Sequence, residues 1–127
     1  MPLKIPERSI QGYVRDLIEL CGVPGLIAFH IPNEGKRTAR QGAYLKRLGM
    51  VPGAPDYSIT LPGGRQRFLE LKTPKGTLSE NQRAFRRRCE ENGVPYAVAR
   101  SCDEAQAILS EWGAIRITDA MVKGRAA

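Results

Sequence analysis

The segment from Tyr57 to Thr73 constrains the fold of this chain more than any other part of the sequence. Residues 57–61 and 65–73 are rich in apolar and β-branched side chains, and Pro62-Gly63-Gly64 lies between them. Two such runs joined by a short glycine-containing loop predict a β-hairpin. The loop length also sets the register, so that Leu61 lies opposite Arg65 and, further along, Asp56 lies opposite Glu70.

Apolar periodicity predicts further elements on both sides of this hairpin. We expect helices at residues 6–21, 38–48, 79–92 and 101–112, and strands at residues 26–31 and 94–100. The order helix, strand, helix, two strands, helix, strand, helix is typical of an α/β fold, with one small mixed sheet flanked by helices on both faces. The length of 127 residues suits a single core. We expect one domain over residues 1–115 and a short C-terminal tail over residues 116–127.

One face of the hairpin gathers unusual chemistry. Directly opposed residues of two strands have Cβ atoms about 5 Å apart, so the predicted register brings the carboxylates of Asp56 and Glu70 together. Lys72 follows Glu70 by two residues and shares its face, whereas Leu69 and Leu71 point to the other face, into the core. Two close carboxylates repel each other, and a hard divalent cation removes that repulsion by bridging their oxygens.

This cluster predicts hydrolysis of phosphodiester bonds with Mg²⁺ or Mn²⁺ as cofactor. Asp56 and Glu70 would hold the cation, and the backbone carbonyl of Leu71 is close enough to add a third ligand. The cation lowers the pKa of water, while Lys72 orients the attacking water or stabilises charge in the transition state. The alternative is an exposed cluster of cross-strand salt bridges, since Glu and Lys two residues apart are common on surface strands.

Three further polar residues each allow two interpretations. Gln82 follows Ser79 by three residues, which indicates a helix capping box, yet it could also face the sheet beside Lys72. The two roles are compatible in kind but compete for one side chain. Glu7 could be a third acid of the metal site, or could complement the dipole of the first helix. His30 has no Cys or Ser at the spacing of a catalytic triad, and a polar structural role is favoured for it.

The chain carries 20 Lys and Arg against 13 Asp and Glu, a net charge of +7. Such an excess is typical of proteins with a polyanionic partner, above all nucleic acid, although it can also serve solubility. Much of it lies in or beside the helices at residues 38–48 and 79–92, where a solvated helix face is the alternative. The residues expected to contact nucleic acid are Asn33, Lys36, Arg37, Arg40, Lys75, Arg83 and Arg87.

Cysteine usage and hydropathy bear on location. Cys21, Cys89 and Cys102 are far apart and form no CxxC pair, so neither a zinc site nor a disulfide framework is indicated. We expect three buried thiols and a reducing, cytoplasmic location. No apolar run approaches the length of about 18 residues that a membrane-spanning helix needs. The N-terminal segment lacks the apolar core of a signal peptide.

The ordered set of motifs resembles a known family. Ala54-Pro55-Asp56, Glu70-Leu71-Lys72 and the segment 78–82 together resemble the VRR-NUC domain, the virus-type replication-repair branch of the PD-(D/E)xK nucleases. The segments 30–37 and 93–98 are similar to the family as well, and the resemblance extends over roughly residues 5–112.

The resemblance implies a restriction-endonuclease-like fold in which Asp56 and Glu70 bind metal and Lys72 is catalytic. It also implies that Gln82 belongs to the active site and that Glu7 matches an acidic position on the first helix. Stand-alone members are typically phage or bacterial proteins, and they resemble Holliday-junction resolvases. They tend to form homodimers, which suits a symmetric four-way DNA junction. The alternatives are a non-catalytic nucleic-acid-binding module of the same fold and a protein whose basic faces bind another partner.

Overall fold

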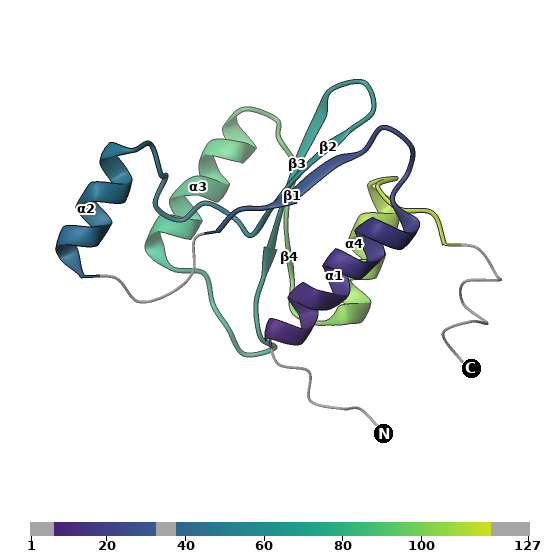
Figure 1. Ribbon diagram of the computed structural model, residues 1–127, viewed down its shortest axis with the longest axis horizontal. Helices are drawn as coiled ribbons and strands as arrows, with labels where there is room; N and C mark the ends of the chain where they lie inside the picture. Colours follow the sequence, from purple (N-terminus) through teal and green to yellow (C-terminus); the bar gives the residue numbers. More distant parts are fainter. Residues whose placement is uncertain (1–6, 33–37, 118–127) are drawn as a thin grey trace.

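A computed structural model describes residues 7–32 and 38–117 of the chain. Within these residues the elements are, in order, α1 (Glu7–Cys21), β1 (Ile27–His30), α2 (Ala39–Arg47), β2 (Tyr57–Leu61), β3 (Arg65–Leu71), α3 (Glu80–Glu91), β4 (Tyr96–Ala99) and α4 (Cys102–Glu111) (Figure 1). The order and type of the elements predicted from the sequence are confirmed. The third strand ends two residues earlier than expected, at Leu71.

The strands form one mixed sheet in the order β1-β2-β3-β4. β1 pairs with β2 and β2 with β3 in antiparallel fashion, whereas β4 runs parallel to β3. Within the hairpin, Leu61 pairs with Arg65 and Tyr57 with Leu69, so the predicted register is confirmed. Continued beyond the paired residues, this register places Asp56 opposite Glu70 and Pro55 opposite Leu71.

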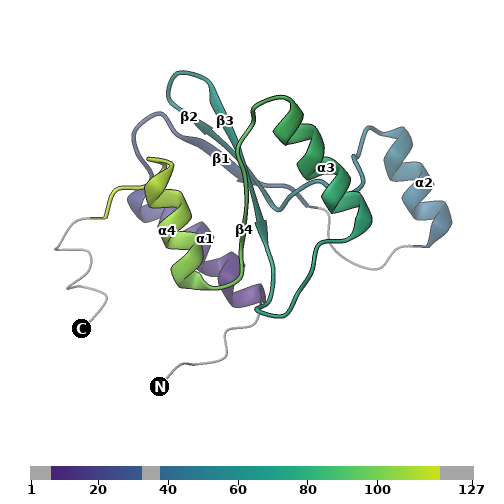
Figure 2. The same ribbon diagram turned by 180° about the vertical axis from the view of Figure 1, so that it is seen from behind.

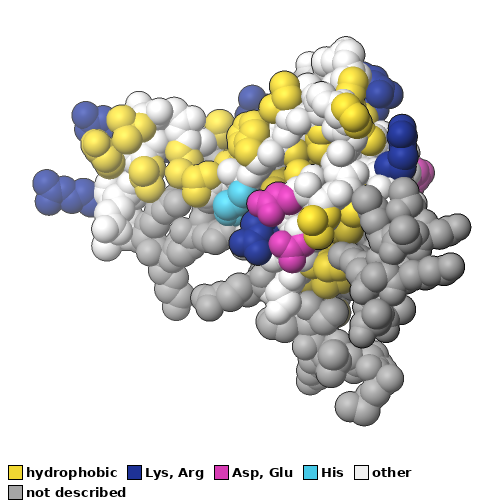
Figure 3. Space-filling model, turned by 45° about the vertical axis from the view of Figure 1, so that its right-hand side comes forward, with side chains coloured by type: hydrophobic (Ala, Val, Ile, Leu, Met, Phe, Trp, Pro, Cys, Tyr) yellow, Lys and Arg dark blue, Asp and Glu magenta, His cyan; other side chains and the backbone are white. Residues whose placement is uncertain are grey.

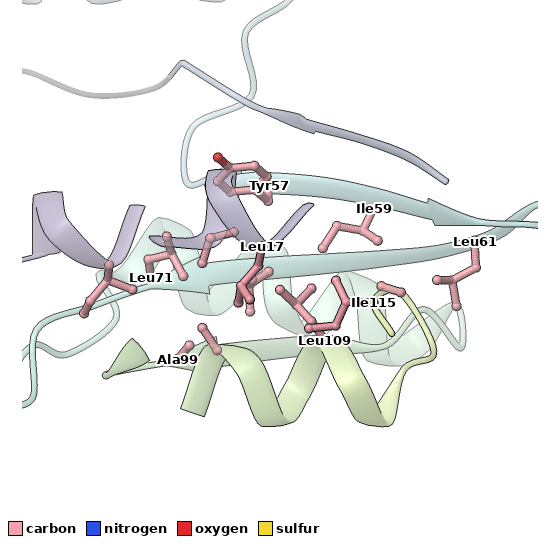
Figure 4. Close-up of a cluster of buried hydrophobic side chains, with 13 residues drawn as sticks. Leu17, Tyr57, Ile59, Leu61, Leu71, Ala99, Leu109 and Ile115 are labelled. Atoms are coloured by element: carbon pink, nitrogen blue, oxygen red, sulfur yellow. The ribbon is translucent and has the colours of Figure 1, made fainter. Parts of the chain in front are cut away.

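One face of the sheet carries the hydrophobic core. Alternate residues of the hairpin point to this face, and Ile59, Leu69 and Leu71 are all fully buried. α1 and α4 lie side by side over it and contribute further buried side chains such as Leu17 and Leu109 (Figures 1 and 4). The three- and four-residue spacing of the apolar residues in α1 puts them on this single stripe. The hairpin is thereby anchored from one side.

α3 covers the opposite face of the sheet (Figure 2). Phe85 of α3 packs edge-on against Phe68 of β3, with ring centroids 5.2 Å apart, and also contacts Tyr96 of β4 at 6.3 Å. Phe68 and Glu70 are two residues apart on one strand, so they share this face. Helices therefore flank both faces of the sheet, as predicted, and the face of Glu70 is the one beneath α3.

α2 stands away from the sheet, next to α3 (Figures 1 and 2). None of its residues is buried, and Tyr44 and Leu48 are 58% and 66% exposed. Figure 3 shows hydrophobic side chains beside Lys and Arg at this end of the molecule. Ile27 and Phe29 of the edge strand β1 are also largely exposed. The apolar surface of α2 and β1 is thus left open in this single chain.

The cysteines are less buried than expected. Cys89 is buried, but Cys21 and Cys102 are only partly buried, because they lie at the end of α1 and the start of α4 rather than within the core. No helix in the described segments is long and apolar enough to cross a membrane.

Candidate metal-binding active site

Asp56 is held in place through both its backbone and its carboxylate. Its carbonyl accepts hydrogen bonds from the N–H of Ile31 at 2.7 Å and from Nδ1 of His30 at 2.9 Å. Its Oδ2 accepts a hydrogen bond from the N–H of Leu71 at 2.7 Å. The end of β1 and the end of β3 therefore both position this residue, which lies just before β2.

Glu70 is the buried acid of the site, with 3% of its surface exposed. Burial raises the pKa of its carboxyl from 4.5 to about 9, and a side-chain hydrogen bond with Asp56 and the negative charge of Asp56 contribute to this rise. The nearby ammonium of Lys72 lowers this pKa but does not offset burial. Without a cation, the carboxyl of Glu70 is therefore protonated at neutral pH. The predicted pairing of Asp56 with Glu70 is present in the structure.

The backbone of Leu71 points toward Asp56. The N–H groups of Phe68 and Lys72 donate to carbonyls on the β4 side, so by strand alternation those of Leu69 and Leu71 point to β2. N–H and C=O of one strand residue point to the same side, and the Leu71 N–H binds Asp56, so the Leu71 carbonyl also faces that side. The position opposite Leu71 is Pro55, which has no N–H to donate. This carbonyl is available as a third oxygen ligand.

Lys72 lies where strand alternation predicts it. Its N–H bonds the carbonyl of Ala99 at 2.9 Å, so the chain stays aligned with β4 for one residue past the end of β3. Its side chain is partly buried and close enough to Glu70 to lower the pKa of that carboxyl. If the two acids bind a cation and the cation binds a phosphate, the nearby ammonium group can contact that phosphate as well.

Gln82 fills both of the roles considered for it. Its Oε1 accepts a hydrogen bond from the N–H of Ser79 at 2.8 Å and completes the capping box of α3. Its Nε2 donates to Oε2 of Glu70 at 3.3 Å. The expectation that the two roles compete was wrong, because the amide offers an acceptor at one end and a donor at the other. The cap fixes the oxygen toward Ser79, which directs the NH₂ group to Glu70.

A close backbone contact joins the segment leading to Asp56 with the first turn of α3. Gly53 has a φ of +79°, and a Cβ there would lie 2.4 Å from the carbonyl group of Asn81. Only glycine permits both the positive φ and this approach. Gly53 therefore sets the distance between the chain that carries Asp56 and the helix that carries Gln82.

The donor set fits a hard divalent cation. Two carboxylates and a backbone carbonyl provide only oxygen ligands, which Mg²⁺ and Mn²⁺ prefer. No cluster of three or more His, Cys, Asp or Glu side chains that could hold a metal occurs in residues 7–32 and 38–117. The side chain of Glu7, the expected further acid, lies outside the described part of the structure.

The residues expected to contact nucleic acid fall into two groups. Arg40 of α2, Lys75 after β3, and Arg83 and Arg87 of α3 are exposed. A hollow of about 310 Å³, lined in part by Lys46 and Gln82, lies beside α2 and the start of α3. Asn33, Lys36 and Arg37 lie outside the described residues.

The structure also brings to the site two residues that the sequence did not assign to it. His30 bonds the backbone of Asp56, a contact that depends on the pairing of β1 with β2. Tyr96 lies on the same face of the sheet as Glu70. Burial raises the pKa of its phenol, and the negative charge of Glu70 raises it further. The guanidinium carbon of Arg86 lies over the ring, 5.7 Å from its centroid. The phenol oxygen is buried without a hydrogen-bond partner. No local sequence signal marks either residue, because both contacts join distant segments.

Comparison with known proteins decides the family. The family model of the VRR-NUC domain matches residues 29–103, more than half of the chain, and these residues include Asp56, Glu70, Lys72 and Gln82. The chain belongs to the VRR-NUC family. It is therefore a nuclease-type domain, and DNA is the substrate that such a domain suggests. No curated protein matches the chain.

Solved VRR-NUC structures share the fold. One described as a VRR_NUC domain protein is 19% identical, with a TM-score of 0.71, and the match covers 87% of this chain and 90% of that one. Another, described as a VRR_NUC domain, is 20% identical with a TM-score of 0.58, covering 84% of this chain and 96% of that one. The fold expected from the sequence is confirmed by these similarities.

Proposed function

We propose that this VRR-NUC protein is a Mg²⁺- or Mn²⁺-dependent endonuclease that hydrolyses phosphodiester bonds of DNA. The observation that carries the proposal is the pairing of the partly buried Asp56 with the buried Glu70, beside the carbonyl of Leu71 on the same side of the strand. When bound, the cation supplies Lewis-acid polarisation of the phosphate and acidifies water.

The residues of the chain then have separate tasks. Asp56 and Glu70 bind the cation, and Gln82 holds the carboxylate of Glu70 in a fixed orientation through its NH₂ group. Lys72 places a positive charge next to this pair, where it can stabilise negative charge on the phosphate or orient the attacking water. Glu7 remains a proposed further acid of the site.

We propose branched or otherwise structured DNA, including four-way junctions, as the preferred substrate. The exposed basic residues of α2 and α3 would contact phosphates on the site's side of the molecule, as would Lys75. We also propose that the protein acts as a homodimer, since the apolar surface of α2 and β1 is open in one chain. Light scattering coupled to gel filtration tests the dimer.

We assign residues 1–115 to the nuclease domain and residues 116–127 to a tail. We also place the protein in the cytoplasm of a bacterial or phage-infected cell, because the spacing of its three cysteines indicates no disulfide framework, as is usual in a reducing compartment.

Cleavage of plasmid, flap and four-way-junction DNA with Mg²⁺, Mn²⁺ or EDTA tests the proposed activity. We expect cleavage only with a cation, complete loss in Asp56→Asn, and a fall of kcat by about 10²–10³-fold in Lys72→Met. Lys75→Met is the matched control, because it removes a nearby exposed charge; it should weaken DNA binding and leave kcat intact. DNA binding without cleavage under any of these conditions would instead favour a non-catalytic module.

A further inference from the structure

We infer that His30 is a positioning residue that holds Asp56 in the geometry needed to bind the cation. This inference rests on the proposed metal site. Nδ1 of His30 lies 2.9 Å from the carbonyl oxygen of Asp56. A carbonyl oxygen can only accept, so Nδ1 carries the proton and donates it to this bond.

The location of Asp56 explains why such support matters. Asp56 lies outside β2, and the preceding residue, Pro55, cannot donate a ladder hydrogen bond to β3. Its backbone is fastened to β1 instead, through Ile31 and His30. Two hydrogen bonds to one carbonyl oxygen from adjacent residues restrict the rotation of the peptide group. The carboxylate, which extends from the same residue toward Leu71 and Glu70, inherits that restriction.

The surroundings of His30 argue against a space-filling role. Its side chain is only partly buried, and with Gln11, Arg15 and Tyr57 it lines an open hollow of about 310 Å³ between α1 and the sheet. The centroid of its ring lies 5.5 Å from that of Tyr57, and the two rings are tilted relative to each other. The ring of His30 is therefore only partly enclosed. The directed bond to Asp56 is the contact that ties His30 to the site.

The geometry of the side chain supplies a discriminating set of variants. Nδ2 of asparagine occupies the place of Nδ1 in histidine, so His30→Asn can restore the donor to the Asp56 carbonyl. The amide of glutamine reaches the place of Nε2, so His30→Gln keeps a polar group of similar size but loses the bond. Support around a metal ligand typically changes metal affinity by about 10–100-fold. We expect Mn²⁺ affinity to fall by that factor in His30→Gln and to stay within about threefold of wild type in His30→Asn.

Titration of Mn²⁺ into the DNA-free protein, followed by electron paramagnetic resonance, measures this directly. Affinity for DNA in EDTA should be the same in wild type and both variants, and circular dichroism should show the same fold. The inference is overturned if both variants bind Mn²⁺ like wild type, or if both lose affinity to the same degree. It is also overturned if the loss appears in DNA affinity alone, which would make His30 a direct DNA contact.

Asp56→Asn, measured beside them, separates failure of this inference from failure of the proposed site. If Asp56→Asn abolishes Mn²⁺ binding and the His30 variants do not change it, only the positioning role is wrong. If Asp56→Asn also binds Mn²⁺ normally, the proposed metal site itself is wrong. In case His30→Gln is poorly folded, His30→Leu with the same titration provides a second variant without the donor.

Discussion

Replacing Glu70 by glutamine should stabilise the cation-free protein, and the gain should grow with pH. The pKa of the Glu70 carboxyl is raised from 4.5 to about 9 in the folded protein. A carboxyl with a raised folded pKa keeps its full stabilising contribution below pH 4.5 and loses it progressively as the pH rises through about 9. Each pH unit in this window lowers the free energy of unfolding by about 1.4 kcal/mol.

The expected difference follows from this slope. At pH 7 the wild-type protein has lost about 3 kcal/mol relative to acidic conditions, whereas at pH 5 it has lost less than about 1 kcal/mol. The glutamine that replaces Glu70 does not ionise, and its amide can still accept from Gln82 and donate to Asp56. Glu70→Gln should therefore exceed wild type in unfolding free energy by about 2 kcal/mol more at pH 7 than at pH 5.

Urea denaturation in EDTA at both pH values measures the difference. Glu111→Gln, at the exposed end of α4, is the matched control and should change stability by less than about 0.5 kcal/mol at either pH. Adding Mn²⁺ should invert the order of stability, since we expect wild type to bind this cation and Glu70→Gln not to bind it. The Mn²⁺ affinity of wild type should rise about tenfold per pH unit between pH 6 and 8, because the cation must displace the proton of Glu70. Equal stability differences at pH 5 and pH 7 would refute the reasoning.

Three further predictions concern the parts that surround the two acids. Gly63→Ala, the control, should lower the free energy of unfolding by about 1 kcal/mol because of its positive φ, and Gly53→Ala should lower it by clearly more. Both positions have a positive φ, but only at position 53 would the added Cβ meet backbone atoms. Similar melting temperatures of the two variants would contradict this. Gln82→Ala should reduce kcat more than Ser79→Ala does, since only the former removes the donor to Glu70, while both lose about 1 kcal/mol of helix capping in urea titrations. Arg87→Ala should reduce the slope of log DNA affinity against log salt by about one, and an unchanged slope would exclude this side chain as a phosphate contact.

The hairpin was predictable because its information is local. A short loop of proline and glycines fixes the register, and strand alternation then assigns Glu70 and Lys72 to one face and Leu71 to the other. The pairing of Asp56 with Glu70 follows from these two rules alone. The helices were predictable for a similar reason, since apolar spacing and the Ser79 cap are features of neighbouring residues.

The remaining contacts depend on how distant segments dock. Gln82 reaches Glu70 because α3 packs on the face of Phe68, and His30 reaches Asp56 because β1 joins the edge of the hairpin. Neither docking leaves a periodic pattern in the sequence. The sequence does not show that the two ends of the Gln82 amide can bind different partners at the same time.

The carbonyl of Leu71 has a consequence for how the site tolerates mutation. A backbone oxygen survives every substitution of the residue that carries it, so long as the strand forms. What decides whether this oxygen is free is the residue across the hairpin, where any amino acid other than proline at position 55 would bring an amide hydrogen toward it. One of the three proposed ligand groups therefore depends on a residue sixteen positions away from the one to which it belongs. A mutational scan would record its loss at Pro55 and overlook Leu71.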